Sequence, residues 1–177
     1  MDLADRRAVA VVLGRLVAEG EILRMGRGIY SYPKAHSKLG TLFPSVDEIA
    51  RALAGRDRIR LLPAGAYAAN LLGLSEQVPG KVVFLTDGGS RKLLVGKMVI
   101  ELRKTAPRYM ALAGKESGIV IQALRHLGKA HVNDALMAKL SRTLSATSKK
   151  ELLRNTSFAP AWMRALLTQI AGGKQNG

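Results

Sequence analysis

Apolar positions near the start of the chain recur with the spacing of one helix face. The pattern fits i, i+3, i+4, i+7 and i+8, so it predicts an amphipathic helix over residues 4–18, ended by Gly20. The other face carries small residues and arginines, which could approach a nucleic-acid groove and its phosphates. The apolar positions are Val9, Val12, Leu13, Leu16 and Val17.

A hairpin is predicted directly after this helix. Residues 21–25 and 29–32 are rich in β-forming side chains and flank the turn Gly26-Arg27-Gly28. A helix followed by a basic hairpin has the order of the second half of a winged helix-turn-helix. A full motif has further helices before the hairpin, so we expect a truncated version that lacks its first helix.

The middle of the chain predicts alternating helices and strands. A polar linker over residues 35–43 leads to a helix that Ser45 and Glu48 open as a capping box and that Gly55 ends. Further elements are expected as a strand at 58–62, a helix at 64–72, and strands at 81–86, 91–95 and 97–103. The sequence Asp87-Gly88-Gly89-Ser90 is typical of a hairpin turn, which predicts a small antiparallel sheet.

The chain after Pro107 predicts only helices. In the helix near residues 119–127 the polar residues Gln122, Arg125 and Lys129 share one face. Three more helices are expected at 133–144, 149–154 and 160–170. The predicted fold class is therefore α+β, with a winged-helix segment over residues 1–40. Residues 41–177 form a second domain with a small antiparallel sheet and a helical C-terminal part.

The charge of the chain indicates a negatively charged partner. The chain has 28 Lys and Arg against 13 Asp and Glu, a formal net charge of +15. Residues 103–177 hold 13 of these basic groups and only 3 acidic ones. Such an excess of one sign steers association with polyanions or acidic surfaces. A merely solvated basic face remains the alternative.

Composition excludes several classes of site. The chain has no cysteine, so disulfides and cysteine-based zinc sites are excluded. We expect no membrane span and a cytoplasmic location. We also expect no metal and no cofactor, because neither a P-loop nor a zinc-binding histidine motif is present. Asp87 and Glu101 could in principle pair as catalytic carboxylates, but a turn residue and a cross-strand ion partner are the simpler interpretation.

The middle of the chain resembles a known family. The runs Gly65-Ala66-Tyr67-Ala68-Ala69-Asn70-Leu71-Leu72-Gly73 and Phe84-Leu85-Thr86-Asp87-Gly88-Gly89-Ser90-Arg91 are similar to AbiEi-like antitoxins of type IV toxin–antitoxin systems. Gly28-Ile29-Tyr30 with Pro33, and Pro44-Ser45, also resemble that family. The resemblance covers nearly the whole chain and is most specific in its central block.

The resemblance implies a bacterial antitoxin without enzymatic activity. Its N-terminal winged helix would bind promoter DNA and repress its own operon, and its C-terminal domain would oppose a nucleotidyltransferase-like toxin. The DNA-binding candidates are Arg6, Arg7, Arg15, Arg24, Arg27, Tyr30 and Lys34. The candidate antitoxin surface comprises Arg103, Arg108, Arg125, Lys129, Lys139 and Arg142.

Two other functions stay open. A truncated antitoxin would not bind operator DNA and would act only on the toxin or its RNA substrate. An enzyme that processes nucleic acid would have to use Asp87, Glu101 or His126, and nothing in their spacing favours it.

Overall fold

A computed structural model of the chain describes residues 3–26, 28–36, 40–77, 79–95 and 98–172, which form a mixed α+β fold. The N-terminal elements are α1 (Leu3–Ala18), β1 (Leu23–Gly26), β2 (Ile29–Ser31), β3 (Lys34–His36) and β4 (Gly40–Leu42). The central elements are α2 (Val46–Asp57), β5 (Leu61–Ala64), α3 (Gly65–Leu71), β6 (Lys81–Thr86), β7 (Arg91–Val95) and β8 (Met98–Lys104). The C-terminal elements are α4 (Pro107–Met110), α5 (Glu116–Leu127), η1 (Lys129–His131), α6 (Asp134–Thr143), α7 (Ala146–Arg154), η2 (Thr156–Phe158) and α8 (Ala161–Ile170).

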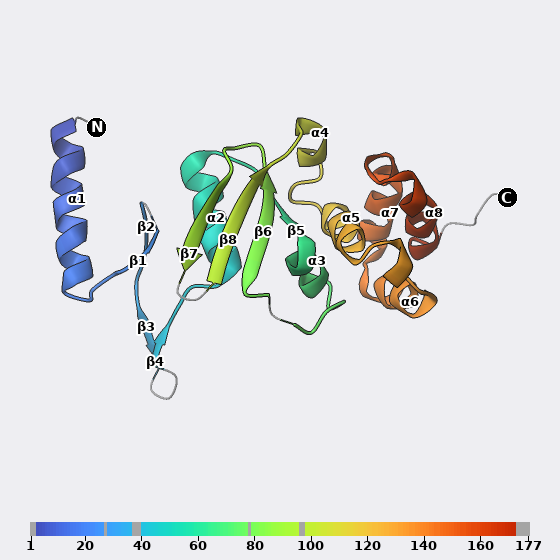
Figure 1. Cartoon of the computed structure of the whole chain (residues 1–177), viewed down its shortest axis with the longest axis horizontal. Helices are drawn as coiled ribbons and strands as arrows, with labels where there is room; N and C mark the ends of the chain where they lie inside the picture. Colours follow the sequence, from blue (N-terminus) through green and yellow to red (C-terminus); the bar gives the residue numbers. More distant parts are fainter. Residues whose placement is uncertain (1–2, 27, 37–39, 78, 96–97, 173–177) are drawn as a thin grey trace.

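These elements are arranged along one long axis. Figure 1 shows α1 standing apart at one end, the sheet with α2 in the middle, and α5–α8 grouped at the other end. The β1–β2 and β3–β4 hairpins connect α1 to the sheet. The apolar face of α1 is left exposed, with Val9 43% and Val12 50% accessible.

The main sheet is mixed, so the prediction of an antiparallel sheet was wrong. Its strand order is β5-β6-β8-β7, and β6 runs parallel to β8. The Asp87–Ser90 turn therefore does not join neighbouring strands. The strand β8 takes one of the two interior positions, beside β6, with Ile100 and Leu102 at 0% and 1% exposure, whereas β7, which carries Lys92, takes an edge.

Two local predictions near α2 were also wrong. The expected linker over 35–43 contains paired strands, since Lys34 lies opposite Leu42 in the β3–β4 hairpin. Helix α2 does not end at Gly55 but continues to Asp57, where Arg58 closes it in the left-handed conformation at φ 52°. One glycine does not end a helix whose other residues are good helix formers.

The predicted start of α2 is confirmed. Ser45 Oγ accepts a hydrogen bond from the Glu48 backbone N–H at 3.2 Å, and the Ser45 N–H donates to Glu48 Oε2 at 2.8 Å. This reciprocal capping box satisfies N–H groups that the first turn of a helix leaves unpaired. It fixes the direction in which α2 crosses the sheet.

Two hydrophobic clusters hold the molecule together. The sheet cluster joins the β1–β2 hairpin, α2 and the sheet, and includes Met25, Ile29, Leu53, Phe84 and Ile100. The helical cluster joins α3 and α5–α8, and includes Leu112, Leu124, Leu140, Leu152 and Leu167. Helix α3 lies between them, because its Tyr67 belongs to the first cluster and its Ala68 and Ala69 to the second.

Candidate nucleic-acid interface

The β1–β2 hairpin is fixed on the body of the protein. Met25 and Ile29 are 3% and 7% exposed and pack in the sheet cluster with Leu53 of α2. A Cβ added at Gly26 would lie 3.3 Å from Leu93 Cδ2 of β7, so the hairpin closely approaches the sheet edge. Burial of its inner side chains leaves the outer side chains in a defined position.

The DNA-binding candidates fall into two groups. Arg6, Arg7 and Arg15 are exposed on α1, and Arg15 Nε lies 3.5 Å from Glu19 Oε1. Arg24 is exposed on β1, directly opposite Tyr30 of β2. The two groups lie on separate elements, since Figure 1 shows α1 standing apart from the β1–β2 hairpin.

Two further candidates cannot be placed. Arg27 lies outside the residues that the structure describes. Lys34 begins β3 and pairs with Leu42, but the description does not extend to its side chain.

The antitoxin candidates are brought together only in part. The guanidinium carbons of Arg108 and Arg125 lie 5.0 and 5.2 Å from the centroid of the Tyr109 ring, within cation–π distance. Both arginines are exposed and form no ion pair within the described ranges. Both guanidinium groups therefore lie close to the same ring, and this is where the fold brings two of the candidates together.

The remaining antitoxin candidates lie on separate elements. Arg103 Nε on β8 is 2.7 Å from Glu101 Oε1. Lys139 on α6 donates to the Gly73 carbonyl after α3. Lys129 and Arg142 are exposed on η1 and α6. The six residues therefore do not form one continuous contact network.

The prediction that Gln122 lies on a polar face was wrong. Its side chain is 5% exposed, and its Nε2 has no hydrogen-bond partner in the part of the chain that is described. The reason is that α5 contacts α3, α7 and β5, which cover more of its surface than a one-sided amphipathic pattern suggests. Arg125, near the end of α5, is exposed as expected.

Sequence reasoning missed Tyr109 and Arg60. Arg60 Nε lies 2.8 Å from Asp87 Oδ2, and its Nη1 donates to the Met110 carbonyl at 3.2 Å, which ties α4 to the sheet. Hydrogen bonds from the Arg60 side chain and backbone lower the pKa of Asp87. The adjacent arginine and aromatic residue after Pro107, in a basic segment, was the available signal for Tyr109.

Asp87 and Glu101 have structural partners rather than each other. Glu101 pairs with Arg103 and, across the sheet, with Lys81 on β6. Hydrogen bonds from Arg103 and then Lys81 lower the pKa of Glu101 to about 2. The interpretation of Asp87 as a turn residue and Glu101 as a cross-strand ion partner is confirmed by these contacts.

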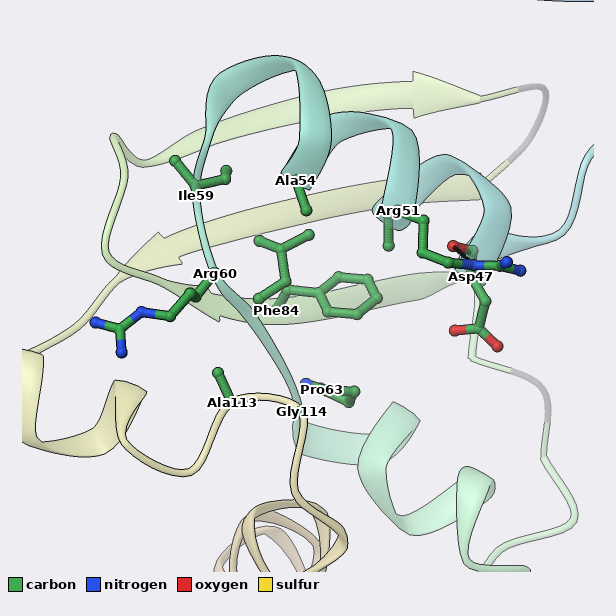
Figure 2. A pocket seen from close by; sticks show the side chains of 11 residues that line it. Asp47, Arg51, Ala54, Ile59, Arg60, Pro63, Phe84, Ala113 and Gly114 are labelled. Carbon is green, nitrogen blue, oxygen red and sulfur yellow. Dashed lines mark hydrogen bonds between the residues drawn. The ribbon is translucent and has the colours of Figure 1, made fainter.

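A groove of about 590 Å³ opens between α2, β5 and the Ala113–Gly114 loop. Figure 2 shows Phe84 on its floor, Arg60 at one end, and Asp47 with Arg51 at the other. Asp47 accepts a hydrogen bond from the Tyr67 hydroxyl at 2.7 Å, and burial together with this bond raises the pKa of Tyr67. Most of the lining residues are apolar, so the groove is suited to binding an apolar group.

Neither a metal cluster nor a membrane helix is found among the described residues. No group of three or more His, Cys, Asp or Glu side chains there could hold a metal ion. No helix in those ranges has the length and apolar character that crossing a bilayer requires.

Comparison with known proteins gives one match. The model of a family of unknown function, DUF6088, matches residues 1–152. The chain belongs to the DUF6088 family. No curated protein and no solved structure matches it. The DUF6088 match spans α1, both hairpins, the sheet and the helices as far as the middle of α7, so it covers the sheet cluster and part of the helical cluster.

Proposed function

We propose that the chain is an AbiEi-like antitoxin of a bacterial type IV toxin–antitoxin system. It would bind the promoter DNA of its own operon through a truncated winged helix, and counteract a nucleotidyltransferase-type toxin through its C-terminal part. No catalytic step is included in this proposal.

The observation that carries the proposal is the packing of the β1–β2 hairpin against the sheet cluster. Met25 and Ile29 anchor it in the sheet cluster, while Arg24 stays exposed on the strand that follows α1. A hairpin held this way can lie along a DNA backbone without losing conformational entropy when it binds, as a wing does. The exposed arginines of α1 add cations that could contact phosphates or guanine edges.

The second half of the proposal is supported by the charge of the helical part. Arg108 and Arg125 share the Tyr109 ring, and no ion pair involves a described residue beyond Arg103. Unneutralised arginines of this kind suit an acidic protein surface or RNA. A toxin that acts on RNA could therefore be opposed at its own surface or at its substrate.

The DNA-binding half is tested by fluorescence anisotropy with a duplex from the chain's own upstream region and a scrambled duplex. Arg24→Ala and Arg7→Ala should each weaken promoter binding, by about 1–3 kcal/mol where the side chain reads a base edge. Lys150→Ala, an exposed cation on α7, is the matched control and should bind as the parent does. Parental affinity in both arginine variants would overturn the assignment of these residues.

The alternative is an antitoxin that does not bind operator DNA. The position of α1 apart from the sheet in Figure 1, with Val11 72% exposed, favours it over a complete DNA-binding domain. Co-expression with a neighbouring nucleotidyltransferase gene separates the two functions. Rescue of growth by a chain that binds no upstream DNA would favour the alternative, and failure to rescue would overturn both antitoxin functions.

A further inference from the structure

A second groove lies between the hairpin turn and the edge of the sheet. It has a volume of about 710 Å³ and is lined by Gly26, Gly28, Arg56, Arg91, Lys92, Leu93 and Leu94. Strand β7 forms one wall, and as the last strand of the described sheet it pairs through hydrogen bonds with β8 alone among the described strands. From the hairpin, Gly26 and Gly28 are among the lining residues.

The groove is positively charged. Among its lining residues are three cations, Arg56, Arg91 and Lys92, and no acid. The nearby carboxylate, Asp57, pairs with both Arg56 and Arg91, so one negative charge is shared between two arginines. Hydrogen bonds from Arg56 and then Arg91 lower the pKa of Asp57 to about 2, which keeps it ionised at neutral pH. The cluster therefore retains a net charge of two positive units.

One of these cations, Lys92, keeps its donors for a ligand. Arg91 Nε is buried and has no hydrogen-bond partner within the described ranges. Lys92 is exposed, and although it lies opposite Glu101 in the sheet register, the ion partners of Glu101 are Lys81 and Arg103. Lys92 therefore keeps its ammonium donors for an anion in the groove, whereas Arg91 contributes positive charge.

The hairpin turn shapes the same groove. Gly28 has φ +69°, and a Cβ there would lie 3.1 Å from Arg56 Nη1, so the guanidinium lies directly against the turn. Leu94 beside Lys92 is 68% exposed, which places an apolar surface next to the cations. A sugar–phosphate backbone presents the matching combination, an anionic phosphate beside a less polar sugar.

We propose that this groove binds the sugar–phosphate backbone of a nucleic acid, with Lys92 contacting a phosphate, the Arg56–Asp57–Arg91 cluster adding positive charge and Leu94 packing on a sugar. This inference rests on the proposed DNA-binding function and extends it, because its contacts come from β7 rather than from the winged-helix segment. Contacts of this kind position a duplex and do not read its sequence.

Lys92→Gln in the full chain tests the groove, because Lys92 is exposed and its loss leaves the Arg56–Asp57–Arg91 pairs intact. Loss of one phosphate contact should reduce the steepness of log affinity against log salt by about 0.9. The loss should be equal for promoter and scrambled duplexes. Lys150→Gln on α7 is the matched control and should keep the parental slope. A parental slope and affinity in Lys92→Gln, with DNA still bound, would overturn the groove and leave the proposed function standing.

A second measurement separates the two proposals where no duplex binds. Inorganic phosphate is titrated into ¹⁵N-labelled parent and Lys92→Gln while the Gly28 and Leu93 amide signals are followed. Saturable shifts of these amides in the parent, weakened in the variant, would retain the groove as a phosphate site although promoter binding had failed. Absence of both duplex binding and phosphate shifts would overturn the groove together with the DNA-binding function.

Discussion

The sheet part and the helical part of the molecule use charge in opposite ways. In the sheet part Asp57, Asp87 and Glu101 each pair with one or two basic side chains, and these pairs connect α2 with β7, Arg60 with the turn after β6, and β6 with β8. In the helical part, no acid forms an ion pair within the described residues. Glu151 of α7 instead accepts hydrogen bonds from Ser117 of α5, and Asp134 lies in the first turn of α6.

This difference distinguishes charges that are paired within the fold from charges that remain available to a partner. Both parts have a closed hydrophobic cluster, so neither needs its surface cations for folding. Cations whose charge is already neutralised contribute little to a partner, whereas those without counter-charge raise the local potential. The helical part is therefore where an acidic partner should be sought, and the hairpin groove is the place in the sheet part where positive charge remains in excess.

The largest expected effect is at the junction of the two parts. A Cβ at Gly118 of α5 would lie 2.5 Å from the Leu112 carbonyl oxygen and 2.9 Å from Leu62 Cδ1 of β5. Gly118→Ala should therefore destabilise the fold by about 1–3 kcal/mol, measured by urea denaturation, although alanine favours helix. Gly55→Ala in α2, where a Cβ would meet nothing within 4 Å, is the control and should stabilise slightly. Equal midpoints for both variants would contradict tight packing at this junction.

A smaller effect should follow from the paired acids of the sheet part. Because the pKa of Asp57 is lowered to about 2 from 3.8, its ionised form stabilises the fold above about pH 4, and this contribution is lost as the pH falls toward 2. Asp57→Asn should lower the urea midpoint at pH 7 and flatten its decline between pH 5 and pH 2. Asp134→Asn, on α6, should keep the parental profile. An unchanged profile in Asp57→Asn would show that the pairs with Arg56 and Arg91 contribute nothing.

Local features of the fold were predictable from sequence, and long-range ones were not. The capping box at Ser45 and Glu48 depends on residues three apart, so spacing alone identified it. The pairing of β6 with β8 depends on which strand is apolar enough to be central, and the turn at Asp87–Ser90 contains no such information. A turn sequence predicts where the chain bends but not what lies beside the strand.

The candidate site shows the same contrast between local features, which were predictable, and long-range ones, which were not. The exposure of Arg24 and Arg125 follows from the alternation or periodicity of their own elements. The meeting of Arg108 and Arg125 at Tyr109, and of Arg56 and Arg91 at Asp57, joins elements distant in the chain. Helical periodicity wrongly predicted a polar face for Gln122. The pattern of one helix does not show how many neighbouring elements cover it.

Replacing Gln122 with an apolar residue should stabilise the helical part. Its buried Nε2 lacks a partner in the described part of the chain, so removing the amide should recover its desolvation cost. Gln122→Met, similar in volume, should raise the free energy of unfolding by about 1 kcal/mol. Gln169→Met, at an exposed position of α8, is the control and should change it by less than about 0.5 kcal/mol. A destabilised Gln122→Met would mean that the amide has a partner, such as an ordered water.

The smallest expected effect on stability comes from reversing charge on the helical part, where the effect on function should be largest. Arg125→Glu, Lys129→Glu and Arg142→Glu change exposed side chains that form no ion pair within the described residues. The melting temperature of the triple variant should fall by no more than a few degrees, chiefly through the lost contact of Arg125 with Tyr109. Neutralisation of the toxin in a co-expression assay should nevertheless be abolished, because an acidic partner or RNA would now be repelled.

A matched variant with Lys149, Lys150 and Arg154 of α7 changed to Glu controls for net charge alone. If both triple variants rescue growth as the parent does, the positive charge of the helical part is a solvated surface and not a binding site.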